Sequence, residues 1–197
     1  MNYHQIFLKG KVKWAKVRQP DVYNGKEVGY TMNLYPNDDV MNEYIMAVND
    51  VLKEAETDVR FNRKKFKNPR NGVREEDNVD GTTTKYIYLK AISSFEDKET
   101  GETTRRVLPI YDRYGKILPE DVLLGNGTEV EVVVQLIPYH FGANTCGITP
   151  RMLAIKVNKL VEYTGGNNYG FQFDVDNDTV TFTDSSSNDE EDIEGDF

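Results

Sequence analysis

Apolar and polar residues alternate along five stretches of the chain with the two-residue period of a half-buried β-strand. The apolar positions of one parity are Ile6, Leu8, Val12 and Trp14; Tyr30, Met32 and Leu34; Ile87, Leu89 and Ala91; Val130, Val132, Val134 and Leu136; and Leu153, Ile155, Val157 and Val161. The other parity carries lysine, tyrosine, glutamate and polar residues. Each strand is therefore predicted to bury one face and to expose the other. Trp14 shares the parity of Ile6, Leu8 and Val12 and is predicted to lie in the core, unless a bulge near Ala15 turns it outward.

Turn signals separate these stretches, and they favour a small closed sheet. The signals are Asn24-Gly25, the polar DKETGET around Gly101, Asn126-Gly127, and Gly147 before Pro150. Five or six strands with one apolar face each predict an all-β protein with a small antiparallel barrel.

One segment has helical periodicity instead. Between about residues 38 and 57, apolar side chains recur every three or four positions, as an amphipathic helix requires, at Met41, Tyr44, Ile45, Val48, Leu52 and Ala55. Asn37 is the expected N-cap, and Asp38 and Asp39 suit the positive end of the helix dipole. A barrel with one capping helix predicts an OB-type fold over residues 1–163, although the helix follows the second strand here and the third in the usual OB-fold.

Acidic residues are concentrated near the end of the printed sequence. The net charge is −9, yet ten of the 33 acids and no base lie from Asp174 onward. That leaves 23 acids beside all 24 bases in residues 1–173, a net charge of about +1. Residues 164–184 are predicted to be a linker or a weak hairpin, two alternatives that stay open, and residues 185–197 a flexible acidic tail that ends in Phe197.

The remaining composition narrows the class of protein. A single cysteine, Cys146, excludes an internal disulfide and fits a small buried or turn residue. No apolar run is long enough for a signal peptide or a membrane span. We expect an intracellular protein without membrane contact.

A dense basic segment lies between the helix and the third strand. Residues 60–74, RFNRKKFKNPRNGVR, contain no acid and seven bases: Arg60, Arg63, Lys64, Lys65, Lys67, Arg70 and Arg74. Such density is typical of a phosphate-binding surface, because neutralised phosphates release counterions. A merely solvated loop is the alternative, which the interleaved Phe61 and Phe66 disfavour.

The exposed parity of the strands carries rings and cations together. The candidates are Lys9, Lys11, Lys13, Tyr35, Tyr86, Tyr88, Lys90 and Tyr139. Aromatic platforms flanked by cations suit single-stranded nucleic acid, since each base offers a π-face for stacking. Packing of Tyr86 and Tyr88 beneath the basic segment is the alternative explanation for those two.

Enzymatic interpretations find little support. His4 and His140 are far apart in sequence, and no P-loop, GxGxxG or nucleophile motif occurs. The stretch DVDND at 174–178 resembles the start of a calcium loop, but Thr179 and Ser185 stand where that loop needs Gly and Glu. We expect no catalytic site, no metal and no cofactor.

Several ordered motifs resemble the phage replicative single-stranded DNA-binding proteins of the podovirus type. They are DGTTT, SFEDKETGET, GNGT and LIPYHFG within residues 80–142, then LVEY and the terminal GDF. The resemblance implies an OB-fold that coats single-stranded DNA in replication, recombination and repair and promotes annealing. It also implies that Tyr139 and Phe141 lie at the DNA groove and that the strand with Tyr86, Tyr88 and Lys90 supplies basic and aromatic contacts.

Two roles are predicted for the acidic tail. Tethered acids compete with DNA for the basic surface, so Arg63, Lys64, Lys65 and Lys67 are candidates for both ligands. A terminal aromatic ring beside a carboxylate also suits capture by a protein pocket, and the resemblance implies recruitment of the replicative DNA polymerase and the helicase/primase. The tail residues concerned are Asp189, Glu190, Glu191, Asp192, Glu194, Asp196 and Phe197.

Alternatives and open points accompany this interpretation. A protein-interaction adaptor without a nucleic-acid role is the main alternative, and a metal-dependent nuclease the weaker one, because a flexible tail does not hold the geometry of metal catalysis. The expected location is the cytoplasm of the infected bacterial host. A homodimer stays open.

Overall fold

The computed structural model describes residues 4–61, 64–141 and 145–163. The chain divides into two units, residues 1–164 and 165–197, and all described residues belong to the first. The predicted linker or hairpin at 164–184 and the acidic tail at 185–197 therefore lie outside the described residues.

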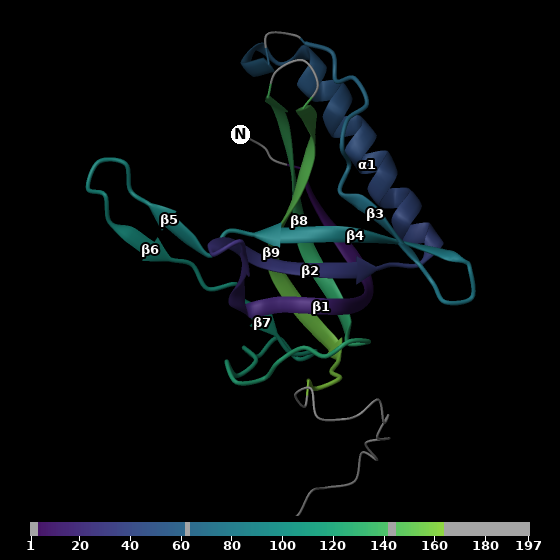
Figure 1. Cartoon of the computed structure of the whole chain (residues 1–197), viewed down its shortest axis with the longest axis vertical. Helices are drawn as coiled ribbons and strands as arrows, with labels where there is room; N and C mark the ends of the chain where they lie inside the picture. Colours follow the sequence, from purple (N-terminus) through teal and green to yellow (C-terminus); the bar gives the residue numbers. More distant parts are fainter. Residues whose placement is uncertain (1–3, 62–63, 142–144, 164–197) are drawn as a thin grey trace, which may run out of the picture. The chain divides into compact units, whose positions relative to one another are not determined.

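A seven-stranded sheet forms the body of the first unit (Figure 1). Its strands, in spatial order, are β3 (Val73–Asp77), β4 (Thr83–Ala91), β2 (Lys26–Tyr35), β1 (Gln5–Tyr23), β8 (Glu129–Phe141), β9 (Thr145–Lys159) and β7 (Ile110–Tyr111). The SFEDKETGET motif, with its predicted turn around Gly101, forms a separate two-stranded sheet of β5 (Ser94–Glu96) and β6 (Thr103–Arg105), which projects from the body as an arm.

A parallel pairing between β4 and β9, at Lys90 and Arg151, closes the sheet into a barrel. The closed ring comprises five strands, β1, β2, β4, β9 and β8. The predicted OB-type barrel is confirmed, but the expectation that it is purely antiparallel is wrong, because a closed ring with an odd number of strands needs at least one parallel pair. The edge strand β7 also pairs with β9 in parallel.

The predicted helix is confirmed as α1 (Asp38–Thr57), between β2 and β4 in the chain. Asn37 is its N-cap, and the Oδ1 atom of Asn37 accepts a hydrogen bond of 3.0 Å from the backbone N–H of Val40. The helix packs against β1, β8 and β9 and lies alongside the β8–β9 hairpin (Figure 1). It buries Met41, Tyr44, Val48, Val51, Leu52 and Ala55. A short 3₁₀ helix, η1 (Val59–Phe61), follows.

Strand parity predicted most of the barrel core. The inward residues of β2, β4 and β8 are buried, and Cys146 is buried too, as expected. Three predicted core positions are wrong: Trp14 is 64% exposed, Val161 is 40% exposed, and Leu153 is only partly buried. Bulges in β1 and in the β8–β9 ladder shift the parity at Trp14 and at Leu153. Val161 lies beyond the end of β9.

Within the described ranges, no helix has the length and apolar character needed to span a membrane.

Candidate nucleic-acid interface

The outward faces of β1, β2, β3 and β4 bring rings and cations together. Cross-strand register places Lys11 beside Tyr35, and Arg74 beside Tyr86. The rings of Tyr35 and Tyr86 stack with centroids 5.2 Å apart and an interplanar angle of 27°. We call Lys13, Tyr35, Arg74, Tyr86, Tyr88 and Lys90 the sheet cluster.

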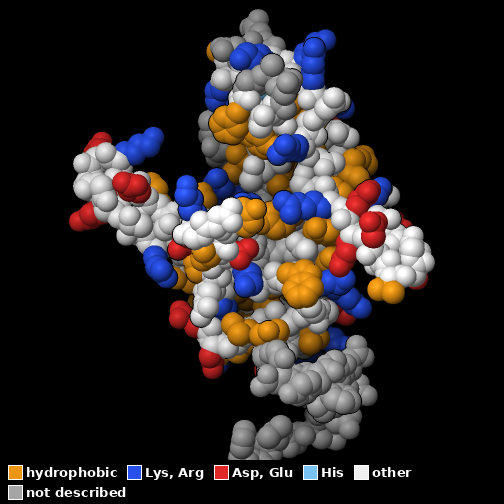
Figure 2. Space-filling view, in the orientation of Figure 1, with side chains coloured by type: hydrophobic (Ala, Val, Ile, Leu, Met, Phe, Trp, Pro, Cys, Tyr) orange, Lys and Arg blue, Asp and Glu red, His pale blue; other side chains and the backbone are white. Residues whose placement is uncertain are grey.

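Cations lie against the rings of the sheet cluster. The Nζ atom of Lys13 is 4.6 Å from the centroid of the Tyr35 ring, and the guanidinium carbon of Arg74 is 3.7 Å from that of Tyr88. The Nζ atom of Lys90 is 5.9 Å from the same Tyr88 ring. Figure 2 shows Lys and Arg side chains interspersed with hydrophobic ones over β1, β2 and β4. The face therefore combines π-surfaces with positive charge, as stacked bases and their phosphates require.

One carboxylate lies within the sheet cluster. The hydroxyl of Tyr35 donates a hydrogen bond of 2.6 Å to Oε2 of Glu76, and Lys13 donates one of 3.1 Å to the same atom. These two donors lower the pKa of Glu76, Tyr35 foremost. Burial, and then the carboxylate, raise the pKa of Tyr35. Glu76 thus holds both side chains in place and keeps its negative charge where a DNA phosphate would meet Lys13.

A second group of rings lies near the closed end of the β8–β9 hairpin. Tyr139 and Phe141 stack with centroids 5.7 Å apart and an interplanar angle of 28°. Phe141 is 73% exposed. Residues two apart on a strand share a face, which explains how the LIPYHF sequence presents both rings on the same side. We call Tyr139, Phe141, Lys64, Lys65, Lys67 and Arg70 the hairpin cluster.

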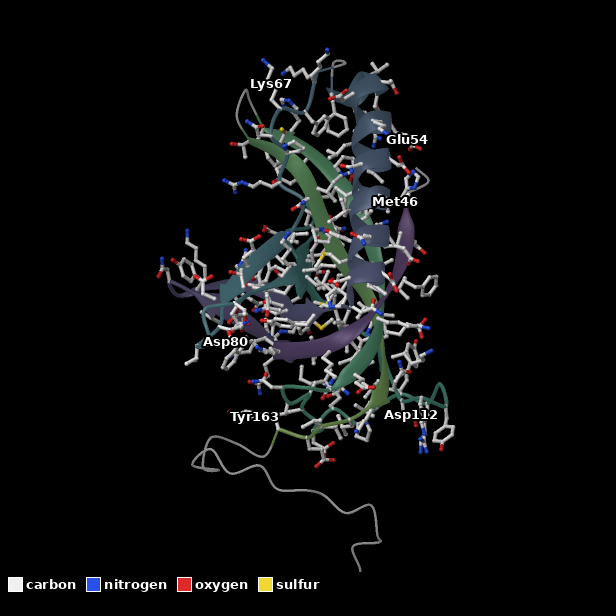
Figure 3. All side chains as sticks on the ribbon, turned by 90° about the vertical axis from the view of Figure 1, so that its right-hand side faces the viewer. Met46, Glu54, Lys67, Asp80, Asp112 and Tyr163 are labelled. Atoms are coloured by element: carbon white, nitrogen blue, oxygen red, sulfur yellow. The ribbon has the colours of Figure 1, made fainter. Side chains whose placement is uncertain are left out.

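Backbone bonds hold the basic segment against this hairpin. The N–H of Arg70 donates to the carbonyl of Cys146 at 3.0 Å, and the N–H of Ile148 donates to the carbonyl of Arg70 at 2.7 Å. Gly147 lies between, opposite Tyr139 in the β8–β9 ladder. Figure 3 shows Lys67 at the end of the unit where this hairpin closes, far from Asp112 and Tyr163. The backbone of the basic segment is therefore held against β9, at the same end of the hairpin as Tyr139 and Phe141.

The two phenylalanines of the basic segment serve as anchors. Phe66 is buried. Its ring packs edge to face against the rings of Phe61 and His140, with centroid distances of 5.6 Å and 5.2 Å. Burial of Phe66 fixes the backbone from which Lys64, Lys65 and Lys67 extend into solvent. Dense charge on an anchored backbone supports a binding surface over a merely solvated loop.

Residues 70–74 connect the two clusters. Arg70 bridges to Gly147 beside Tyr139, and the carbonyl of Gly72 accepts a hydrogen bond of 2.9 Å from the N–H of Tyr88. Two residues later, Arg74 covers the ring of Tyr88. A cationic path therefore runs from the hairpin cluster to the sheet cluster along one short segment.

The structure distributes the predicted site residues unevenly. Lys13, Tyr35, Tyr86, Tyr88 and Lys90 belong to the sheet cluster, and Lys64, Lys65, Lys67, Tyr139 and Phe141 belong to the hairpin cluster. Lys9 and Lys11 are exposed on β1 and pair in register with Glu131 and Glu129 of β8, which moderates their charge. Arg63 and the tail residues Asp189, Glu190, Glu191, Asp192, Glu194, Asp196 and Phe197 lie outside the described residues.

Sequence reasoning missed two residues of this surface, Arg151 and Glu76. Arg70 and Arg74 were recognised only as bases of the 60–74 segment, without the specific contacts that the structure gives them. Arg151 pairs in register with Lys90 across the closure of the barrel, a contact that strand parity alone does not reveal. Glu76 was missed because its neighbours Lys13 and Tyr35 come from distant strands.

Metal-assisted chemistry has no visible scaffold in the described part of the chain. No group of three or more His, Cys, Asp or Glu residues there is placed to hold a metal ion. His4 contacts Glu54 at 2.8 Å, whereas His140 packs on Phe66. The surface offers stacking and charge neutralisation.

Comparison with known protein families agrees with this geometry. The family model of the bacteriophage T7 single-stranded DNA-binding protein matches residues 37–154, more than half of the chain. The chain belongs to this family. Membership assigns it to phage single-stranded DNA-binding proteins and not to enzymes, as the sequence analysis expected.

Two single-stranded DNA-binding proteins of phages T3 and T7 are similar to this chain in sequence. The chain is 30% identical over 122 residues to the single-stranded DNA-binding protein of Enterobacteria phage T3, which spans 61% of this chain and 52% of that protein. It is 32% identical over 91 residues to that of Escherichia phage T7, spanning 46% of this chain and 38% of the relative. The aligned part thus covers about half or less of each relative's length.

Two solved structures share the fold. The crystal structure of gp2.5, the single-stranded DNA-binding protein encoded by bacteriophage T7, aligns with a TM-score of 0.61 at 23% identity, covering 84% of this chain and 92% of that one. The single-stranded DNA-binding protein from bacteriophage Enc34, solved in complex with single-stranded DNA, aligns with a TM-score of 0.53 at 12% identity, covering 82% and 89%. Both support the gp2.5-like OB fold of this family member.

Proposed function

We propose that this protein binds single-stranded DNA without sequence specificity and coats it during phage replication, recombination and repair, promoting the annealing of complementary strands. Its expected place of action is the cytoplasm of the infected bacterium. The observation that carries the proposal is the sheet cluster, where the stacked Tyr35 and Tyr86 rings lie among Lys13, Arg74 and Lys90. Family membership and the DNA-bound Enc34 relative support it.

Binding would combine stacking with charge neutralisation. Unpaired bases stack on the tyrosines of the sheet cluster and on Tyr139 and Phe141, each stacked base contributing about 1 to 3 kcal/mol. Phosphates meet the lysines and arginines of the basic segment. Duplex DNA already stacks its bases internally, so it gains only the phosphate contacts. Selectivity for single strands follows without any reading of sequence.

The acidic tail has two proposed roles, which rest on its sequence. The acids compete with DNA for the cationic path, because a tethered polyanion has a high effective concentration near the barrel. The tail also recruits the replicative DNA polymerase and the helicase/primase, through Phe197 and the acids around it. The first role concerns access to DNA, and the second concerns protein partners.

One gel-shift series tests the central proposal. The protein is titrated against oligo(dT), a duplex of equal length and an RNA strand of equal length, each with and without magnesium. We expect strong retardation of the single DNA strand, weaker retardation of the duplex, and intact substrates in every lane. Equal weak binding to all three polymers would favour the adaptor alternative, and magnesium-dependent shortening of the DNA would favour a nuclease.

A further inference from the structure

Trp14 has a backbone conformation that its residue type disfavours. Its φ angle is +54°, in the left-handed region, and the other two non-glycine residues with positive φ in the described ranges are Asn24 and Asn68. Asparagine tolerates this region, whereas a bulky aromatic residue there is an outlier. Strain of this kind persists only where the surrounding structure imposes it.

A β-bulge and a side-chain cap impose that conformation. Lys13 pairs with Asn33 and Lys16 with Thr31, so two residues of β1 oppose one residue of β2. The left-handed position of such a bulge is ordinarily occupied by glycine. In this chain Oδ1 of Asn126 accepts a hydrogen bond of 2.9 Å from the backbone N–H of Trp14. The bulge removes Trp14 from the inward parity and leaves 64% of the residue exposed.

The charges around the exposed indole suit a polyanion. The segment from Gln5 to Pro20 carries five cations and no acid: Lys9, Lys11, Lys13, Lys16 and Arg18. Arg18 donates hydrogen bonds to backbone carbonyls of the 118–122 loop, and Lys13 pairs with Glu76, so Lys16 and Lys13 are the cations nearest to Trp14 in sequence that a phosphate would meet. Lys13, the residue immediately before Trp14, contacts the Tyr35 ring of the sheet cluster. Trp14 therefore follows the sheet cluster directly along β1. An exposed apolar ring among cations is the arrangement that binds stacked, unpaired bases.

We propose that Trp14 is a base-stacking residue that extends the single-stranded DNA path along β1 beyond the Tyr35–Tyr86 pair. This inference rests on the proposed function, since it assigns a further contact to the same ligand. The strained bulge is then the device that turns a ring with core parity outward, next to cations that bind phosphates.

Trp14 is the only tryptophan in the chain, so tryptophan emission, excited selectively over the twelve tyrosines, reports on this site alone. The full-length protein is titrated with oligo(dT), and with a duplex of equal length, while tryptophan emission is recorded. The anisotropy of a labelled oligo(dT) measures binding independently in parallel. Saturating single strand is expected to quench most of the emission, and the duplex to quench it much less.

Three variants make the test specific. Trp14→Gly removes the ring and relieves the backbone strain, because glycine adopts positive φ freely. We expect it to keep its thermal unfolding temperature and to weaken binding of the labelled strand by about fivefold or more. Trp14→Phe keeps a ring and should bind within about twofold of the parent. Phe95→Ala, which removes an exposed ring from the separate β5–β6 sheet, is the control and should bind like the parent.

The outcomes separate this inference from the proposed function. Unchanged emission while labelled DNA still binds would overturn the role of Trp14 and leave the proposed function standing. Emission that changes with protein concentration, but not with DNA, would overturn it in favour of self-association. A large fall in unfolding temperature for Trp14→Gly would show that the ring is structural. Failure of the labelled strand to bind at all would contradict the proposed function itself.

Discussion

Among the described residues, Glu76 is the acid that contacts both the Tyr35 hydroxyl and Lys13 at the centre of the sheet cluster. It accepts hydrogen bonds from Tyr35 and Lys13, and these donors lower its pKa. Glu76 therefore stays ionised to a lower pH than an ordinary glutamate. A DNA phosphate approaching Lys13 meets this charge first. Under the proposed function the carboxylate therefore has two opposed effects, because it positions two side chains proposed to bind DNA and it repels the phosphates.

Replacing Glu76 with glutamine should reveal which effect is larger. Glutamine keeps an acceptor for Tyr35 and removes the negative charge, so Lys13 becomes available to a phosphate. We expect Glu76→Gln to tighten binding of oligo(dT) by about two- to fivefold, the scale of one exposed charge pair. Anisotropy titrations at low salt measure the change.

Glu75→Gln is the matched control for this prediction. Glu75 precedes Glu76 on β3, pairs with Lys85 at 3.9 Å, and points to the other side of the strand by parity. Both variants change the net charge by the same amount. Equal tightening in the two would mean that net charge alone acts, and weaker binding by Glu76→Gln would mean that positioning is the larger effect.

Residue-level prediction succeeded where strand parity held. The alternation of β2 and β4 placed Tyr35, Tyr86, Tyr88 and Lys90 on the outward face, where the structure has them. It failed at Trp14, because one inserted residue in β1 reverses the parity, as the alternative of a bulge near Ala15 allowed; periodicity alone does not decide whether such an insertion occurs. Glu76 could not be found at all, since its partners come from β1 and β2.

At the scale of elements, the contact between the basic segment and β9 determines where the cations lie. Arg70 and Gly147 approach closely, and a Cβ atom at Gly147 would lie 2.1 Å from the carbonyl oxygen of Arg70. The φ angle of Gly147 is +154°, which glycine adopts most readily. This glycine therefore permits the approach of a nine-residue irregular segment, 64–72, to the β8–β9 hairpin.

Gly147→Ala should separate the segment from the hairpin. The clash displaces Arg70 and with it the basic segment from β9, so we expect weaker DNA binding together with a loss of about 1 to 3 kcal/mol in the free energy of unfolding. Anisotropy titration measures the first effect, and denaturant unfolding measures the second.

Gly25→Ala supplies the comparison for this element. Gly25 has a φ angle of +73° in the β1–β2 turn, and a Cβ atom added there would meet nothing within 4 Å. This variant has the cost of placing alanine at a positive φ angle but no steric clash, so its DNA affinity should match that of the parent. Equal loss of affinity in both variants would refute the idea that the Arg70–Gly147 contact places the cations.

The elements with strong periodicity were predictable from the sequence, whereas the strand pairing that closes the barrel was not. The helix at 38–57 follows from its apolar spacing and the Asn37 cap, and the barrel follows from five one-sided strands. The parallel pairing of β4 with β9 depends on contacts between residues about 60 positions apart, which no local pattern encodes. The same holds for the basic segment, whose charge was evident while its position beside Tyr139 was not.

At the scale of the whole molecule, opposite charges occupy different parts of the chain. Residues 1–173 carry about +1, with a cationic path across the barrel, while ten acids follow without a base. A protein that is acidic overall can therefore present a basic surface to DNA. Under the proposed function these acids compete with DNA for that surface, and competition between polyanions is sensitive to salt.

Deleting residues 184–197 removes seven acids and should tighten binding of oligo(dT) several-fold at low salt. The advantage should shrink as salt rises, because screening weakens the tail's competition. For parent and deletion alike, the logarithm of affinity should fall with the logarithm of salt by about 0.7 for each phosphate neutralised. A variant with the same seven acids changed to Asn or Gln keeps the length of the tail and should match the deletion. Unchanged or weaker DNA binding by both charge-removal variants would exclude the tail as a competitor and leave it only a role in recruiting proteins.

The terminal ring is tested separately by Phe197→Ala. This variant should bind DNA like the parent and lose recruitment of replication proteins, measured by pull-down with polymerase or helicase/primase.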